Sequence, residues 1–242
     1  MRRAIVFGAT GGIGQAICTE LAQSGWSLYL HCHTKWQEAC QLSQKLMQQY
    51  PEQDFIPIRL SFLAENSDLS KFVQDLLPLN AAVFAQGITD YHFVNGQEMS
   101  QVDDMIKVNL TTPIKLAGLL EPLLTKNDFS RIVFLGSVYG KQASALEAVY
   151  SATKAGLTAF SQGYAREVAS ANLTVNVVAP GAVDTAMNAM ISAEDMNKVK
   201  EEIPAGRLAR GSDVSYWVNV LLDKRSSYLT GQTIYVSGGW LI

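Results

Sequence analysis

The segment Arg3-Ala-Ile-Val-Phe-Gly-Ala-Thr-Gly-Gly-Ile-Gly14 decides the fold of this 242-residue chain. It joins a short apolar run, typical of a buried strand, to a glycine turn, and residues 13–24 then carry apolar side chains at helical spacing. Free amides at the start of such a helix attract phosphate groups, and glycines let the backbone approach them closely. Gly8, Gly12 and Gly14 therefore predict a nucleotide site at a strand-to-helix junction.

The same alternation of elements continues to the end of the chain. Extended apolar stretches are predicted at residues 27–32, 54–60, 81–85, 132–135, 173–178 and 233–236. Helices are predicted at residues 35–50, 69–77, 99–124 with a kink at Pro113, 148–170 and 213–222. Strands separated by helices imply right-handed crossovers and a parallel sheet covered on both faces. We therefore expect one α/β domain over residues 1–242, a doubly wound sheet of about seven strands that binds ligands outside the carboxyl ends of its strands.

Composition and charge disfavour several classes of function. Lys and Arg number 19 against 22 Asp and Glu, and a net charge of −3 gives no field that would recruit nucleic acid or an anionic membrane. The first residues lead directly into a strand, so we expect no signal peptide and a cytoplasmic protein. Three cysteines are too few for a disulfide framework. In His31-Cys32-His33 only the two histidines share a strand face, and without a second ligand pair we expect no metal site.

Tyr150 and Lys154 are the strongest candidates for chemistry. Their spacing of four residues places a phenol and an ammonium one turn apart on the same face of the predicted helix. The cation can then hold the phenol proton in a transferable state. Ser137 lies thirteen positions before the tyrosine, just beyond the predicted strand 132–135. This set predicts an acid–base centre at a strand end.

Further motifs give the chain a family resemblance. The spacing Gly-x-x-x-Gly-x-Gly, Asn109 within Val-Asn-Leu, Ser137, Tyr150-Ser-Ala-Thr-Lys154 and Pro180-Gly-Ala-Val-Asp-Thr185 together resemble the short-chain dehydrogenase/reductase family. Residues 155–187 are most similar to the bacterial 3-oxoacyl-[acyl-carrier-protein] reductases. The resemblance implies a Rossmann-type fold, reduction of a ketone by NADPH, and a homodimer or homotetramer. The apolar tail Gly238-Gly-Trp-Leu-Ile242 also favours self-association.

The resemblance implies a role for each catalytic residue. Tyr150 would protonate the carbonyl oxygen, and Ser137 would donate a hydrogen bond to the same oxygen. Lys154 would lower the pKa of the phenol and hold the cofactor ribose, and Asn109 would bind a water that links the lysine to solvent. Cofactor contacts are implied for Gly8, Thr10, Gly11, Gly12, Ile13, Gly14, His33, Ser61, Gly87, Tyr150, Lys154, Pro180, Gly181, Val183 and Thr185.

The choice between NADPH and NADH is usually made at the end of the second strand, where a carboxylate would bind the ribose hydroxyls and repel a 2′-phosphate. This position is close to Cys32, so no acid is present. His33 and Lys35 follow and can face a phosphate, although the arginine common in NADP-using relatives is missing here. We therefore expect NADPH rather than NADH.

Two departures from the family pattern affect the cofactor. Phe84-Ala-Gln-Gly87 stands in place of the usual Asn-Asn-Ala-Gly, so the asparagine that ties neighbouring strands is absent. Ser61 stands where relatives often have an Asp or Asn beside the adenine. We expect a cofactor affinity lower than is typical of the family.

The substrate side also departs from the pattern. Ser137, Glu147 and Tyr150 are the expected substrate contacts, and the carboxylate of Glu147 suits an amine better than an anionic carrier arm. Asp128 and Ala171 replace arginines that dock an acidic carrier protein in the relatives. A methionine-containing stretch at about residues 186–210 is expected to form a substrate lid.

Three functions stay open at this stage. The first is a reductase of 3-oxoacyl thioesters or another ketone, carried by a protein or free. The second resembles elongation factor P 5-aminopentanone reductase, whose ketone sits on a modified protein lysine. The third is a nucleotide-sensing protein without catalysis, in which we would expect a broken Ser-Tyr-Lys set, whereas here the set is complete.

Overall fold

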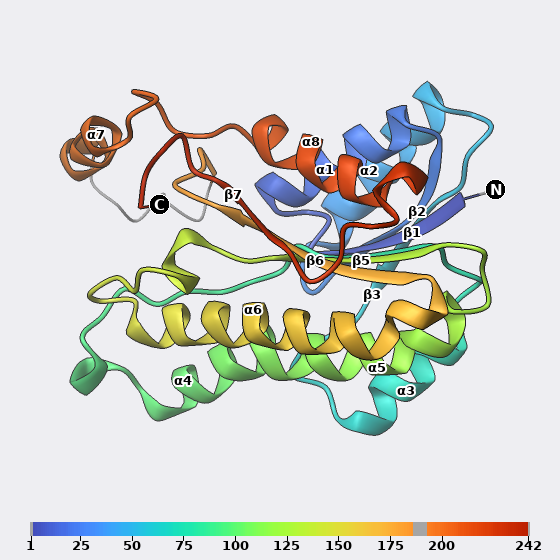
Figure 1. Cartoon of the computed structure of the whole chain (residues 1–242), viewed down its shortest axis with the longest axis horizontal. Helices are drawn as coiled ribbons and strands as arrows, with labels where there is room; N and C mark the ends of the chain where they lie inside the picture. The colour runs from blue at the N-terminus through green and yellow to red at the C-terminus, as the bar shows by residue number, and fades with distance from the viewer. Residues whose placement is uncertain (1, 186–192, 242) are drawn as a thin grey trace.

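The computed structural model describes residues 2–185 and 193–241, in which strands and helices alternate as the sequence predicts (Figure 1). The strands are β1 (Arg2–Phe7), β2 (Trp26–Cys32), β3 (Phe55–Arg59), β4 (Ala81–Phe84), β5 (Ser130–Leu135), β6 (Leu173–Pro180) and β7 (Thr233–Val236). The helices are α1 (Gly12–Gln23), α2 (Trp36–Gln49), α3 (Asn66–Gln74), α4 (Met99–Ile106), α5 (Thr112–Leu124), α6 (Ala148–Val168), α7 (Ala193–Glu202) and α8 (Gly211–Leu222). Residues 186–192, the first part of the expected lid, lie outside the described residues.

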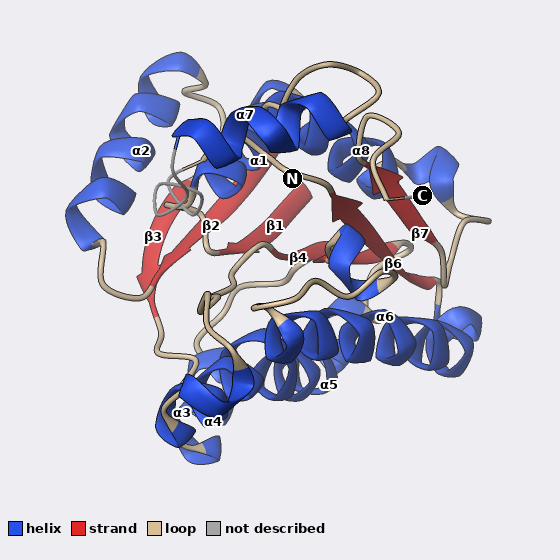
Figure 2. Cartoon of the chain, turned by 90° about the vertical axis from the view of Figure 1, so that its left-hand side faces the viewer, coloured by secondary structure: helices blue, strands red, loops and turns tan. Residues whose placement is uncertain are grey.

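The strands form one parallel sheet in the order β3-β2-β1-β4-β5-β6-β7 (Figure 2). The order of the strands reverses between β1 and β4, because the chain returns from the β3 edge to the other side of β1. In open α/β sheets ligands bind at this point, outside the carboxyl ends of the strands. Gly8 follows β1 and Gly87 follows soon after β4, so both flank the reversal.

Helices cover both faces of the sheet. α1, α2 and α8 pack on one face, and α3, α4, α5 and α6 lie on the other (Figure 1). The strands are buried between these layers, and β1, β2, β5 and β6 are apolar over most of their length. This agrees with the predicted doubly wound sheet, because a parallel sheet buried on both faces needs near-continuous apolar strands.

An aromatic ladder ties the central strands at their carboxyl ends. Phe84 is in register with Phe7 on one neighbouring strand and with Phe134 on the other. The rings stack with centroid separations of 4.7 Å and 4.8 Å, about the spacing between strands. Phe84 occupies the place of the first asparagine of the family pattern. The connection between neighbouring strands is therefore made by ring stacking instead of by an amide.

The predicted helix at residues 99–124 is divided in two. A π-helical turn at Lys107–Thr111 separates α4 from α5, and Pro113 lies in the first turn of α5. The turn runs directly into α5, since the Thr112 N–H donates to the Lys107 carbonyl, and the proline, which has no N–H, follows it. The interruption therefore lies just before the proline. It contains Asn109, which is fully buried.

The C-terminal segment packs inward. The ring of Trp240 is 8% exposed and lies edge-on to Tyr139, with 5.8 Å between ring centroids. Its indole N–H donates to Oε2 of Glu202 at 3.2 Å. Trp240 of the apolar tail is thus packed within the chain.

Candidate active site

The glycine turn after β1 forms a cradle at the start of α1. Gly8 has a φ of +77°, which favours glycine, and a Cβ there would lie 2.8 Å from the Gln86 amide nitrogen. A Cβ on Gly14 would lie 2.0 Å from the Gly8 carbonyl oxygen. No side chain caps the start of α1 at Gly11. The turn therefore leaves helix amides available, at a place where only glycine lets the backbone come so close.

A buried histidine holds this turn in place. Nδ1 of His31 accepts the Gly8 N–H at 3.1 Å, and Nε2 donates to the Leu60 carbonyl at 3.0 Å. The ring therefore joins the carboxyl ends of β1, β2 and β3. Burial lowers the pKa of His31 to about 4, so the ring is neutral at pH 7. It is not arranged as a metal ligand, since both of its nitrogens are used inside the fold.

The acid–base residues meet in one cleft on the β4 side of the turn. Ser137 follows β5, whereas Tyr150 and Lys154 lie on the first two turns of α6. The hydroxyl of Ser137 lies close enough to the Tyr150 phenol to act on its pKa. Nζ of Lys154 lies 5.6 Å from the centre of the tyrosine ring and donates to the Leu135 carbonyl at 2.7 Å. The cleft has a volume of about 200 Å³.

Burial sets the proton affinities in this cleft. It raises the pKa of the Tyr150 phenol well above its ordinary value, and the nearby hydroxyl of Ser137 acts in the opposite direction. Burial also lowers the pKa of Lys154 from 10.5 to about 8. The Tyr150 phenol therefore stays protonated at neutral pH. The pKa of Lys154 lies only slightly above neutral pH.

Asn109 connects the loop after β4 to α6 beside the cleft. Its Oδ1 accepts the Ile88 N–H at 2.9 Å, and its Nδ2 donates to the Ile88 carbonyl at 2.8 Å and to Oγ1 of Thr153 at 3.3 Å. A Cβ on Gly87 would lie 3.5 Å from Oδ1 of Asn109 and 3.6 Å from Nζ of Lys154. Asn109 therefore fixes the loop after β4 beside the lysine, and its expected role toward water stays a prediction.

The predicted cofactor residues fall into two groups. Those near the acid–base set line the same cleft: Ile13, Gly87, Pro180, Gly181, Val183 and Thr185. A Cβ on Gly12 would lie 2.8 Å from Cγ2 of Thr185, so the glycine turn and the segment after β6 are in close proximity. The second group, Thr10, Gly11, His33 and Ser61, lies in the turn and just beyond β2 and β3. The hydroxyl of Ser61 accepts the Leu63 N–H at 3.2 Å.

The substrate end of the cleft is acidic. Glu147 is 8% exposed, lines the cleft, and accepts a hydrogen bond from Oγ1 of Thr89 at 2.7 Å. Burial raises the pKa of Glu147 and the bond from Thr89 opposes that shift. Asp195 on α7 lines the same cleft, and the charges of both carboxylates add to burial in raising the pKa of Tyr91. The sequence analysis placed residues 186–210 at the substrate site as a lid, and Asp195 of α7 does line the cleft, but neither Asp195 nor Tyr91 was identified individually.

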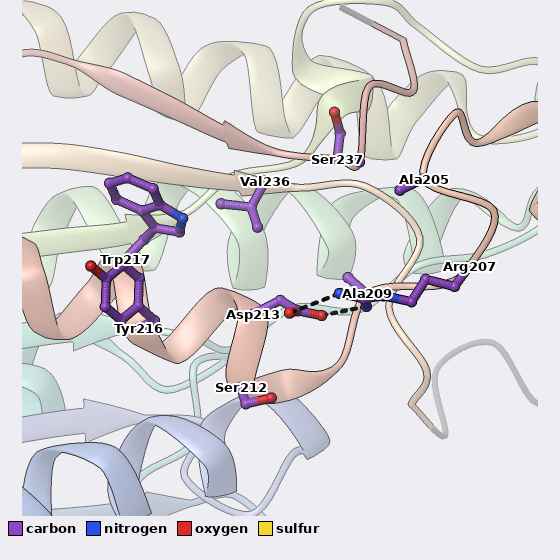
Figure 3. A pocket seen from close by; sticks show the side chains of 10 residues that line it. Ala205, Arg207, Ala209, Ser212, Asp213, Tyr216, Trp217, Val236 and Ser237 are labelled. Atoms are coloured by element: carbon purple, nitrogen blue, oxygen red, sulfur yellow. Dashed lines mark hydrogen bonds and ion pairs between the residues drawn. The ribbon is translucent and has the colours of Figure 1, made fainter.

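A second cavity, with a volume of about 330 Å³, lies beside α8 and the end of β7 (Figure 3). Arg207 donates to both carboxylate oxygens of Asp213, at 2.6 Å and 3.1 Å. Asp213 also accepts the Arg210 N–H at the start of α8. The aromatic rings of Tyr216 and Trp217 form another wall. Since the charged groups of this cavity neutralise each other, we place the chemistry in the first cleft.

Within residues 2–185 and 193–241, no helix has the length and apolar character needed to cross a bilayer. In the same residues, no three His, Cys, Asp or Glu side chains gather in a way that could hold a metal ion.

The chain is similar to known proteins over nearly all of its length. A family model described as short chain dehydrogenase matches residues 2–196. The uncharacterized oxidoreductase YmfI of Bacillus subtilis is 32% identical, with 99% of this chain and 98% of that protein covered. The 3-oxoacyl-[acyl-carrier-protein] reductase FabG of Salmonella typhimurium is 33% identical, with coverages of 98% and 96%.

A solved structure agrees with these sequence matches. It is that of a putative NAD(P) dependent gluconate 5-dehydrogenase from Beutenbergia cavernae with bound NADP. It superposes with a TM-score of 0.92 at 25% identity, and the match covers 99% of this chain and 96% of that one. With the parallel sheet, the glycine turn and the Ser-Tyr-Lys cleft, these matches show that the chain belongs to the short-chain dehydrogenase family of oxidoreductases.

Proposed function

We propose that the protein is an NADPH-dependent ketone reductase in which Tyr150 donates the proton. The observation that carries this proposal is the single cleft shared by Ser137, Tyr150 and Lys154 next to the glycine turn. When bound, the nicotinamide supplies a hydride to the carbonyl carbon. Negative charge then develops on the carbonyl oxygen, where the hydroxyls of Ser137 and Tyr150 donate hydrogen bonds. Tyr150 transfers its proton to that oxygen and yields the alcohol.

Lys154 makes this proton transfer feasible. The phenol resists ionisation in its buried site, as the raised pKa of Tyr150 indicates. The ammonium of Lys154, 5.6 Å from the ring centre, stabilises the phenolate that remains after transfer. The interaction is strong because the lysine is buried, and charges in a low-dielectric site are weakly screened. Asn109 bonds to both backbone groups of Ile88 and so positions the loop that lies next to Lys154.

The residues present fit a dinucleotide. The amides at the start of α1 are suited to the pyrophosphate, and the close approach of Gly12 to Thr185 leaves the turn and the segment after β6 on one side of the cleft. Thr185 and the Val183 backbone would hold the nicotinamide amide, as in the family. Cys32 at the end of β2 supplies no carboxylate that would repel a 2′-phosphate. These features favour NADPH over NADH.

The first substrate class that we propose is a 3-oxoacyl thioester, carried by a protein or by coenzyme A. Support comes from relatives named 3-oxoacyl-[acyl-carrier-protein] reductase and acetoacetyl-CoA reductase, the latter from Allochromatium vinosum at 30% identity. Against a protein carrier, Asp128 and Ala171 replace the docking arginines of the family pattern. A small thioester meets no such obstacle.

A second substrate class is favoured by the acidic end of the cleft. Glu147 is its buried carboxylate, and Lys154 is its one cationic side chain among the described residues. Asp195 also lines it but pairs with Lys198 at 3.1 Å. A buried carboxylate is stabilised by a cation that reaches it, so a ketone carrying a primary amine would fit this end. Such a ketone is either free or attached to a modified protein lysine, as in the substrate of elongation factor P 5-aminopentanone reductase.

A substrate comparison separates the two classes. Purified protein is mixed with NADPH and either an acetoacetyl thioester or an aminoketone, and the loss of NADPH absorbance is followed. Glu147→Gln is expected to lower kcat/KM for the aminoketone by about 10-fold and to leave the thioester within about 2-fold. If Glu147→Gln affects both substrates equally, the carboxylate does not select a cation. If no ketone is reduced, a non-catalytic nucleotide-sensing protein is favoured.

The proton-donor role is tested by Tyr150→Phe. The variant lacks only the hydroxyl, so we expect turnover to fall by about 10² to 10⁴-fold. The affinity for NADPH, measured by fluorescence titration, is expected to change by less than about 3-fold, because the ring remains. A variant that retained more than about a tenth of the rate would contradict the role of Tyr150 as proton donor.

A further inference from the structure

Arg59 supplies the positive charge that the sequence did not locate beside the cofactor site. It is the last residue of β3 and is in parallel register with Cys32, the last residue of β2. Adjacent strands lie about 4.8 Å apart, so the two residues are neighbours at the carboxyl edge of the sheet. The end of β2 is where the adenosine ribose of a dinucleotide is selected in such folds. An arginine on the next strand therefore stands directly beside this position.

Two contacts hold the guanidinium of Arg59 at this edge. It lies 5.2 Å from the ring centre of Trp36, the first residue of α2, in a cation–π arrangement. It also lies beside the thiol of Cys32, whose pKa is raised by burial and partly lowered again by this cation. Trp36 is 38% exposed and Arg59 is exposed. The charge is thus held toward the ribose position and open to solvent.

The lysine near this edge is engaged elsewhere. Lys35 forms an ion pair with Glu38 at 3.3 Å. Within residues 2–185 and 193–241, no Asp or Glu forms an ion pair with Arg59. Its charge is therefore available to an anionic ligand, whereas that of Lys35 is partly neutralised.

We propose that Arg59, held by Trp36, binds the 2′-phosphate of NADPH and gives the protein its preference for that cofactor. This inference rests on the proposed use of NADPH and names the group that selects it. A guanidinium presents several donors in one plane, remains charged at any working pH, and binds phosphate through paired hydrogen bonds. The neutral thiol of Cys32 carries no negative charge that would repel the phosphate dianion. Lys35 and His33, the residues that the sequence suggested, then have a secondary part.

The test is a binding measurement that needs no turnover. Dissociation constants of NADPH and NADH are measured by fluorescence titration, and those of adenosine 2′,5′-bisphosphate and 5′-AMP by calorimetry. Arg59→Gln is expected to weaken NADPH and the bisphosphate by about 10- to 100-fold and to leave NADH and 5′-AMP within about 2-fold. Trp36→Leu, which leaves the cation unsupported, is expected to weaken NADPH by about 3-fold. Lys45→Gln on the exposed side of α2 removes the same charge and is the matched control.

The possible outcomes distinguish an error in the role of Arg59 from an error in the proposed use of NADPH. If the unaltered protein shows no preference for NADPH, both the proposed cofactor and the role of Arg59 are wrong. If the unaltered protein prefers NADPH and Arg59→Gln keeps the full preference, only the role of Arg59 is wrong. Equal weakening of NADPH and NADH would also overturn the inference, because the 2′-phosphate would not be the group recognised. A circular dichroism melt of each variant shows whether it is folded, as expected for substitutions at exposed positions.

Discussion

Lys154 carries a charge that its surroundings disfavour, and this gives the enzyme a pH dependence. Burial lowers the pKa of Lys154 to about 8. Above that pH the lysine loses its proton, and the phenolate of Tyr150 loses the cation that stabilises it. We expect kcat/KM for NADPH, which reports the free enzyme, to fall by about 10-fold per pH unit above about pH 8. In Lys154→Arg the guanidinium stays charged, so this alkaline decline should disappear although the rate is lower. A profile of the unaltered enzyme that stays flat to pH 10 would contradict the assignment.

The same residue should reduce the stability of the protein. Its ordinary pKa is 10.5 and its pKa in the fold is about 8, so the charged form destabilises the native state by about 3 kcal/mol at neutral pH. Lys154→Met should raise the melting temperature at pH 7. The unfolded chain binds more protons than the native one between pH 8 and pH 10.5, so the unaltered protein gains stability across that range. The advantage of the variant should shrink there, and thermal melts at several pH values check this.

Single residues also show what the sequence could and could not predict. The spacing of Tyr150 and Lys154 fixes their common helix face, so their convergence with a strand-end serine was predictable. Arg59 was not identified, because its role depends on which strands are neighbours and in which register. The signal that would have found it is a cation at the end of an apolar strand, considered once the order β3-β2-β1 was assumed.

At the scale of elements, the carboxyl ends of β1, β2 and β3 are joined through one side chain. His31 accepts the Gly8 N–H and donates to the Leu60 carbonyl, so it fixes the glycine turn relative to two further strands. The sequence indicated the strands but not this link, since it does not show which backbone groups the side chain of a histidine in a strand reaches. The helix at residues 99–124 was predicted with a kink at Pro113 and not with a π-helical turn before it, because apolar periodicity does not reveal the extra residue of such a turn.

His31→Leu tests this link. The variant leaves the Gly8 N–H and the Leu60 carbonyl without their partner, so we expect NADPH affinity to fall by about 10-fold. The pKa of His31 is about 4 in the fold and 6.5 ordinarily, so the unfolded chain takes up its proton first as pH falls. Stability from this histidine is complete above pH 6.5 and declines by about 3 kcal/mol down to pH 4. Urea unfolding at pH 7, 5.5 and 4.5 should show a smaller acid loss in the variant, and an unchanged loss would contradict the role of His31.

The whole molecule carries its chemistry on one edge of the sheet, between layers that are otherwise closed by apolar packing. Self-association stays a prediction, to be checked by light scattering. Trp240 in the tail packs inside the chain and so contributes little exposed apolar surface to it. The sequence predicted a carboxylate at the substrate end, Glu147, but not how it is oriented. In the fold, the Glu147 side chain is held by the bond from Thr89, 58 residues earlier in the chain.

The cofactor should stabilise the whole fold, because the strand ends and helix starts that would bind it come from all parts of the chain. A ligand that binds only the native state at 100 times its dissociation constant adds about 2.7 kcal/mol to the free energy of unfolding. For a domain of this size, that corresponds to a rise in melting temperature of about 5 to 10 °C. At the same concentration NADH should give a smaller rise, since it lacks the 2′-phosphate, and in Arg59→Gln the two cofactors should give similar rises. Equal rises with both cofactors in the unaltered protein would contradict selection of NADPH.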